Sequence, residues 1–225
     1  MKHFNKCDCC NHSSLLEVTR KNLVGKTKTQ SPERVQRSKE YSPYTKSSKI
    51  DIDKLIYDDV IVVSVPVGKY VDTIEFDGFL RTLINMVKQQ AHGNVNLQVV
   101  TRALQKVADG NIRVDCTCAD WQYRYRYWAT RYGYAYGTPE TRPAKIRNPR
   151  DDIGAMCKHL TSVLNNKRWM VQLASKLNYD IQTNIDEIRK RYKLAEDEFY
   201  VQKSGVNLRY QNKDNPKRGQ TTDEE

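Results

Sequence analysis

The sequence predicts an α+β fold with more helix than strand, organised as a small core between two extended arms. Apolar and β-branched runs over 59–65 and 70–76 predict strands that pair as a hairpin, with Pro66 and Gly68 between them. Apolar residues at helical spacing predict helices in the rest of the core. Both ends of the chain are polar, so we expect them to gain order only from a partner.

Capping residues mark where the first two helices begin. Asp77 is the expected N-cap of a helix over 78–91, and Asn96 is the expected N-cap of a helix that runs to Ala108. A short strand over 112–114 follows, because apolar and polar residues alternate there.

The predicted core spans residues 50–201 and ends with a helix over 180–197. Residues 1–49 form the expected basic arm, and residues 202–225 form a polar C-terminal tail. The chain has 225 residues, which suits one medium domain with arms of this length.

Positive charge is concentrated in two stretches of the chain. The net charge is +11, of which residues 1–49 carry +7 and residues 111–150 carry +5, while the remainder sums to −1. Such a field attracts polyanions, and nucleic acid is the commonest one. A basic arm also suits an acidic protein neighbour in an assembly, so both kinds of partner stay open.

The sequence contains no stretch of about 18 apolar residues and no apolar signal segment at its start. We therefore expect a protein made in a reducing cytosol, without a membrane partner. In that compartment its six cysteines serve as metal ligands or free thiols rather than as disulfides.

Two short cysteine motifs predict a zinc site. Cys116 and Cys118 form a C-x-C pair, and Cys157 and His159 form a C-x-H pair that begins an apolar helix. Zinc prefers four such thiolate and imidazole ligands in a tetrahedron. Because four protein ligands leave no open position for water, the predicted ion is structural rather than catalytic.

This pattern resembles the SWIM-type zinc finger, whose motif is C-x-C, a variable gap and C-x-H. The strand before Cys116, the aromatic Trp121 after the first pair and the helix after His159 fit the same family. The resemblance implies one structural zinc ion in a module over about 111–175. The gap of 38 residues between the pairs is longer than is usual in the family, but the cost of closing a loop grows only logarithmically with its length.

The amino-acid sequence of the same region is also similar to small proteins encoded by tailed bacteriophages. The similar stretches are DCTCADWQYRYRYW and NPRDDIGAMCKHL. That similarity implies a viral protein present first in the host cytoplasm and then in the virion.

Aromatic residues and arginines alternate in an insert over 121–136, WQYRYRYWATRYGYAY. Helical spacing over 119–131 is favoured over a strand, because no turn residue interrupts it. Three roles stay open: an aromatic stripe on the zinc core, a protein interface, or stacking on single-stranded nucleic acid. The interface or nucleic-acid candidates in and after the insert are Trp121, Arg124, Tyr125, Arg126, Trp128, Arg131, Lys145 and Arg147.

A second cysteine cluster lies close to the N-terminus. Cys7, Cys10 and His12 could supply ligands to a second metal ion, but ligands this close in sequence rarely all reach one ion. Free thiols on an exposed arm are the alternative interpretation.

The sequence contains no phosphate-binding glycine loop, no nucleophile elbow and no H-E-x-x-H motif. We therefore expect a non-enzymatic, zinc-stabilised binding protein without a small-molecule substrate. One candidate role is a structural or assembly component of a tailed-phage particle whose arms contact neighbouring subunits. The other is a basic nucleic-acid-binding accessory factor for packaging, replication or recombination of DNA.

Overall fold

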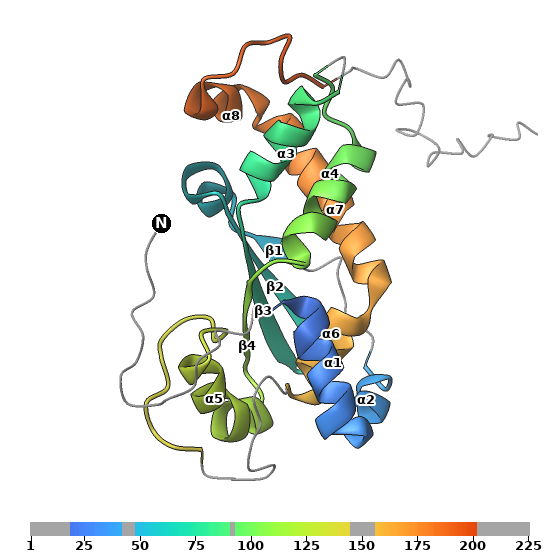
Figure 1. Cartoon of the computed structure of the whole chain (residues 1–225), viewed down its shortest axis with the longest axis vertical. Coiled ribbons are helices and arrows are strands. Elements are labelled where there is room, and N and C mark those ends of the chain that lie inside the picture. Colours follow the sequence, from blue (N-terminus) through green and yellow to red (C-terminus); the bar gives the residue numbers. More distant parts are fainter. Residues whose placement is uncertain (1–18, 42–47, 91–92, 145–155, 202–225) are drawn as a thin grey trace, which may run out of the picture.

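A computed structural model describes residues 19–41, 48–90, 93–144 and 156–201. The predicted α+β class is confirmed, with a small antiparallel sheet among a larger number of helices (Figure 1). The predicted C-terminal tail over 202–225 lies outside the described residues.

The sheet has four antiparallel strands in the order β1-β2-β3-β4. Its centre is the predicted hairpin of β2 (Val60–Val67) and β3 (Tyr70–Asp77), in which Val63 pairs with Ile74. Gly68 allows the tight turn between them because it adopts a φ of +60°. The edge strands are β1 (Lys49–Ile50) and β4 (Ile112–Cys116).

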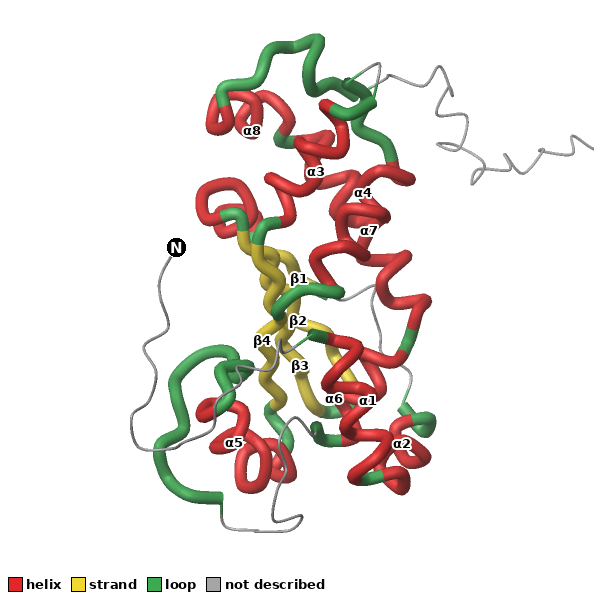
Figure 2. Tube along the Cα trace, in the orientation of Figure 1, coloured by secondary structure: helices red, strands yellow, loops and turns green. Residues whose placement is uncertain are grey.

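Helices pack at both ends of this sheet. Figure 2 shows one group containing α3 (Phe79–Lys88), α4 (Leu97–Ala108), α7 (Lys167–Thr183) and α8 (Ile185–Tyr192), in which α4 contacts both α3 and α7. A second group contains α1 (Arg20–Gln30), α2 (Pro32–Ser38) and α6 (Lys158–Asn165). None of the helices in the described ranges is long and apolar enough to cross a membrane.

Two helix boundaries differ from the prediction. The helix expected over 78–91 ends at Lys88. The helix expected over 180–197 is divided at Asn184 between α7 and α8, because the amide side chain of Asn184 bonds the carbonyl of Asp180 and competes with the helix backbone.

Asp59, rather than the expected Asp77, caps helix α3. Gly78 occupies the N-cap position in a left-handed conformation with a φ of +77° and makes no side-chain bond. The buried carboxylate of Asp59 accepts hydrogen bonds from the backbone N–H groups of Leu80 and Arg81, and from the Arg81 side chain at 2.7 Å. The hairpin brings this carboxylate to the helix end, so local sequence spacing did not reveal the cap.

Residues 19–41 correct the expectation that residues 1–49 form an extended arm. They fold into α1 and α2, which pack on one another and on α6. The average composition of this stretch is polar, but Leu23, Val24 and Thr27 share one face of α1 and are buried. Lys49, the last residue of the expected arm, also departs from the prediction, because it forms strand β1 together with Ile50 and pairs with β2.

We predict that Asp59→Ala lowers the free energy of unfolding by about 1–3 kcal/mol, because two backbone donors and a guanidinium lose a buried acceptor. Alanine is also strained at the φ of 59° found there. The exposed neighbour Asp58 is the matched control, and its replacement by alanine should change stability by less than about 0.5 kcal/mol. Urea unfolding monitored by circular dichroism measures both variants, and equal stabilities would contradict the cap.

Candidate metal centre

Three elements of the fold carry the four predicted ligands. Strand β4 ends at Cys116, and the following turn presents Cys118 at the start of the helical insert. Cys157 is the N-cap of α6, and His159 lies in its first turn. Helix α6 contacts both β3 and β4, so it brings the second pair of ligands against the first.

The ligand atoms of these four residues all lie within 4.8 Å of one another. The Sγ of Cys116 lies 3.8 Å from the Nδ1 of His159, so Nδ1 is the imidazole nitrogen that faces the thiols. All four side chains are buried, and none is more than 2% exposed. A buried group of three thiols and one imidazole at these separations can hold a metal ion.

Backbone geometry holds the C-x-C turn in a form that favours thiolates. The backbone N–H of Cys118 donates to the Sγ of Cys116 at 3.4 Å, and that of Trp121 donates to the Sγ of Cys118 at 3.3 Å. Thr117 fixes the turn on β3, because its N–H donates to the carbonyl of Val71 and its hydroxyl accepts from the N–H of Val71. The turn is therefore preorganised by contacts outside the ligand set.

The three thiols do not ionise equally without a cation. Hydrogen bonds from Cys116 and Cys157 lower the pKa of Cys118, because they stabilise its thiolate. Hydrogen bonding to Cys118 and Cys157 raises the pKa of Cys116, and burial raises the pKa of Cys157. The metal-free cluster therefore favours one thiolate, and binding of a metal ion must release the remaining thiol protons.

Asp72 is a buried carboxyl beside the ligand cluster. It pairs with Cys116 in the register of β3 and β4, and it is 0% exposed. Neither of its oxygens has a hydrogen-bond partner among the described residues. Burial is the main cause that raises the pKa of Asp72 to about 8; the nearby Cys116 thiol opposes this shift, and the charges of Cys118 and Asp115 add to it. A carboxyl that is largely neutral at pH 7 adds little negative charge beside the thiols.

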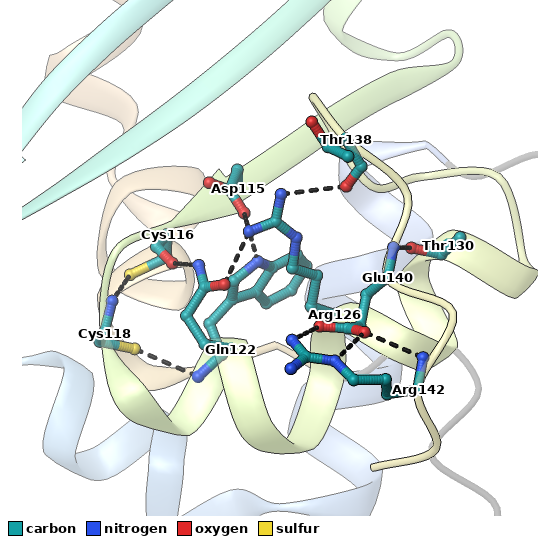
Figure 3. Close-up of polar contacts among 10 residues, drawn as sticks. Asp115, Cys116, Cys118, Gln122, Arg126, Thr130, Thr138, Glu140 and Arg142 are labelled. Atoms are coloured by element: carbon teal, nitrogen blue, oxygen red, sulfur yellow. Dashed lines mark hydrogen bonds and ion pairs between the residues drawn. The ribbon is translucent and has the colours of Figure 1, made fainter.

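A polar network ties the helical insert to strand β4 (Figure 3). The indole N–H of the buried Trp121 donates to Asp115 at 2.6 Å, and the amide of Gln122 donates to the carbonyl of Cys116 at 2.6 Å. Arg126 donates to Gln122 at 2.6 Å and to the carbonyl of Thr138 at 3.0 Å. The network thus orients the segment that carries Cys118.

The N-terminal helices close the centre from another side. The ring centroid of Tyr41, which follows α2, lies 4.7 Å from that of His159. In the sheet, the ring centroid of Tyr70 in β3 lies 4.5 Å from that of His159. The hydroxyl of Ser162 in α6 donates to the carbonyl of Tyr41 at 2.9 Å. Arg34 of α2 forms an ion pair with Asp120, so α2 is joined to the insert as well as to α6.

The insert is helical, as expected, but only part of it faces the core. A π-helical turn, η3 (Trp121–Tyr125), continues directly into α5 (Arg126–Arg131). Trp121, Tyr125 and Ala129 are buried, whereas Trp128 is half-buried and stacks on Tyr132 with ring centroids 6.3 Å apart. A π-helical turn is closed by i→i+5 hydrogen bonds, so it holds more residues than an α-helical turn. This shifts the buried face of the insert away from Trp128.

The structure removes several of the interface or nucleic-acid candidates. Trp121 and Tyr125 offer no surface to a partner, because both are 0% exposed. Arg124 pairs with Asp120 at 3.5 Å, and Arg126 pairs with Asp115 at 3.7 Å. The guanidinium of Arg131 lies over the ring of Tyr127, 5.8 Å from its centroid. These side chains of the insert therefore stabilise the fold of the insert itself.

The remaining candidates fall outside the described residues. These are Lys145 and Arg147 of the basic loop, and Cys7, Cys10 and His12 of the N-terminal cluster. Sequence reasoning also missed Asp72, Tyr41 and Arg34, which surround the centre from distant elements. Only the position of Asp72 in a predicted strand hinted that it faces inward, and no local signal marked the other two.

No family model, curated protein sequence or solved structure matches the chain.

We predict that the purified protein contains about one metal ion per chain and that prolonged chelation lowers its melting temperature, because metal binding is linked to folding. Cys116→Ala should abolish the bound metal and unfold the region between β4 and α6. Cys9→Ala is the matched control, because Cys9 belongs to neither set of candidate ligands, and it should leave the metal content unchanged. Elemental analysis and thermal unfolding measure both effects, and unaltered metal content in the Cys116 variant would contradict the assignment.

We also predict that Arg34→Ala lowers the free energy of unfolding by about 1–3 kcal/mol, because it removes the ion pair with Asp120 and a cation 5.1 Å from the Tyr125 ring. Loosened N-terminal helices should then be cut faster by trypsin at Lys26 and Lys28. Arg37→Ala, at an exposed position of the same helix, should change stability by less than about 0.5 kcal/mol. Equal proteolysis of the two variants would exclude a clamp by Arg34.

Proposed function

We propose that the chain is a non-enzymatic binding protein stabilised by one zinc ion, and that it serves as an assembly component of a tailed-phage particle. The observation that carries the structural role of the metal is the burial of all four ligands, which are 0–2% exposed. A catalytic zinc needs an open coordination position and access for substrate. A closed and buried ligand set supports a role in folding instead.

The donor chemistry supports zinc as the ion. Three thiolates and one imidazole are soft or borderline ligands, which suit zinc better than magnesium or calcium. In a tetrahedral zinc site with Zn–S bonds of about 2.3 Å, sulfur atoms lie roughly 3.8 Å apart. The four ligand atoms lie within 4.8 Å of one another, so only small shifts are needed to enclose the ion. The resemblance of the C-x-C and C-x-H pairs to the SWIM-type zinc finger adds to this argument.

The assembly role is supported by the resemblance to tailed-phage proteins and by the way the N-terminal segment is used. Residues 19–41 contribute few buried apolar side chains but make contacts with α6 and the insert. This segment therefore lies at the periphery of the fold, where neighbouring molecules can reach it. In this proposal the protein is made in the host cytoplasm and is then incorporated into the virion.

A role as a nucleic-acid-binding accessory factor is the second candidate. The observation that favours it is the net charge of +11, which attracts phosphate backbones.

Mass spectrometry of purified particles from the source separates the two roles. We expect the chain to be present at a fixed copy number relative to the major capsid protein if it is an assembly component. Its absence from intact particles, together with its presence in infected cells, would reject the assembly role. Metal analysis of the recombinant chain should find zinc, and a stoichiometric amount of another metal would reject the choice of ion.

A further inference from the structure

Among the described residues, the two basic stretches use their charge differently. In the described part of the insert, Arg124, Arg126 and Arg142 are each paired with an acidic side chain. By contrast, residues 19–41 contain seven basic and two acidic side chains, a net of +5. Among the described residues, the helices α1 and α2 therefore carry a concentration of positive charge.

Most of the basic side chains on these two helices point outward. Arg20 and Arg34 are used internally, because Arg20 bonds the carbonyl of Leu164 at 3.1 Å and Arg34 pairs with Asp120. Four others are exposed, and none of the ion pairs among the described residues involves them. These four are Lys21, Lys28, Arg37 and Lys39.

Two of the lysines frame a glycine on the outer face of α1. Lys21, Gly25 and Lys28 follow the spacing i, i+4 and i+7, which places them on one side of a helix. A Cβ added at Gly25 would meet no atom within 4 Å, and the residue does not adopt a positive φ. Neither packing nor backbone conformation explains a glycine that weakens the helix. Because glycine has no side chain, a ligand can closely approach the backbone between the two lysines.

The chemistry of this face suits a phosphate backbone better than a protein surface. The exposed large apolar side chains of the described residues are Tyr57, Val71, Leu97, Tyr123, Val171 and Tyr179, and none belongs to α1 or α2. Protein interfaces are built around apolar and aromatic anchors, whereas nucleic-acid interfaces are polar and strongly positive. Charge without apolar anchors therefore favours nucleic acid.

We propose that the outer face of α1 and α2, centred on Lys21, Gly25 and Lys28, binds the phosphate backbone of nucleic acid without sequence preference. This inference rests on the second candidate function and names its surface. Because α1 and α2 pack on α6, which carries His159, the metal centre holds this surface in place.

Fluorescence anisotropy with the full-length, metal-loaded chain and a 30-base-pair DNA duplex tests the proposal. If the four exposed side chains each engage one phosphate, log affinity should fall with log salt at a slope of roughly −3.6. Lys21→Gln combined with Lys28→Gln should reduce the slope to roughly −1.8 and weaken binding in 0.1 M salt by more than about tenfold. Gly25→Glu should also weaken binding, because it places a carboxylate between the lysines.

The matched control removes the same charge from another helix. Arg102→Gln combined with Lys106→Gln alters two exposed positions on α4 and should leave the slope unchanged. Equal weakening by both double variants would show that net charge matters and not this face, which overturns the proposal. Unchanged binding by the Lys21 and Lys28 variant would also overturn it but leave the second candidate function standing.

Failure of the wild-type chain to bind DNA at 50 mM salt would reject the proposal and the second candidate together, without affecting the assembly role. Competition distinguishes nucleic acid from other polyanions. An acidic peptide or a vesicle with anionic lipids that displaces the duplex at equal charge concentration would overturn the choice of nucleic acid. Melting temperatures of the two double variants should match that of the wild type, because the altered side chains are exposed. Gly25→Glu should not lower the melting temperature, because glycine weakens a helix.

Discussion

Four ligand side chains from two distant segments of the chain must meet in one buried site, and the rest of the structure is arranged around that requirement. Strand β4 delivers Cys116, the start of the insert delivers Cys118, and α6 delivers Cys157 and His159. The hairpin supports β4 on one side, while α1 and α2 hold α6 from the other. A metal ion bound there would join elements that the chain alone separates widely.

Three buried thiolates repel one another and lose their hydration, and the surrounding residues reduce this electrostatic cost. Backbone N–H groups donate to the sulfur atoms of Cys116 and Cys118, which disperses negative charge. Asp72 adds little charge at pH 7, because burial raises its pKa. The cationic groups of Arg34 and Arg126 neutralise carboxylates around the centre without touching the ligands. Full ionisation of the three thiols still needs the charge of a bound cation.

The distribution of positive charge follows from this arrangement. Arginines close to the centre are used in ion pairs and in contacts with aromatic rings, as with Arg34 over Tyr125. The exposed lysines of α1 have no such structural use among the described residues. The basic side chains of α1 and α2 therefore fall into two sets with different physical roles. An inner set holds the helices on the core, and an outer set faces solvent.

Local sequence patterns were enough to predict the α+β class, the β2–β3 hairpin, the Asn96 cap of α4 and the four candidate ligands. These features depend on short-range periodicity and on residue types whose chemistry allows few alternatives. Three contacts could be found only in the folded chain: Asp59 caps α3, Asp72 lies beside Cys116, and Arg34 holds the N-terminal helices on the insert. The physical reason is that each of these contacts joins residues that are distant in sequence. They therefore form only when the fold brings the two partners together.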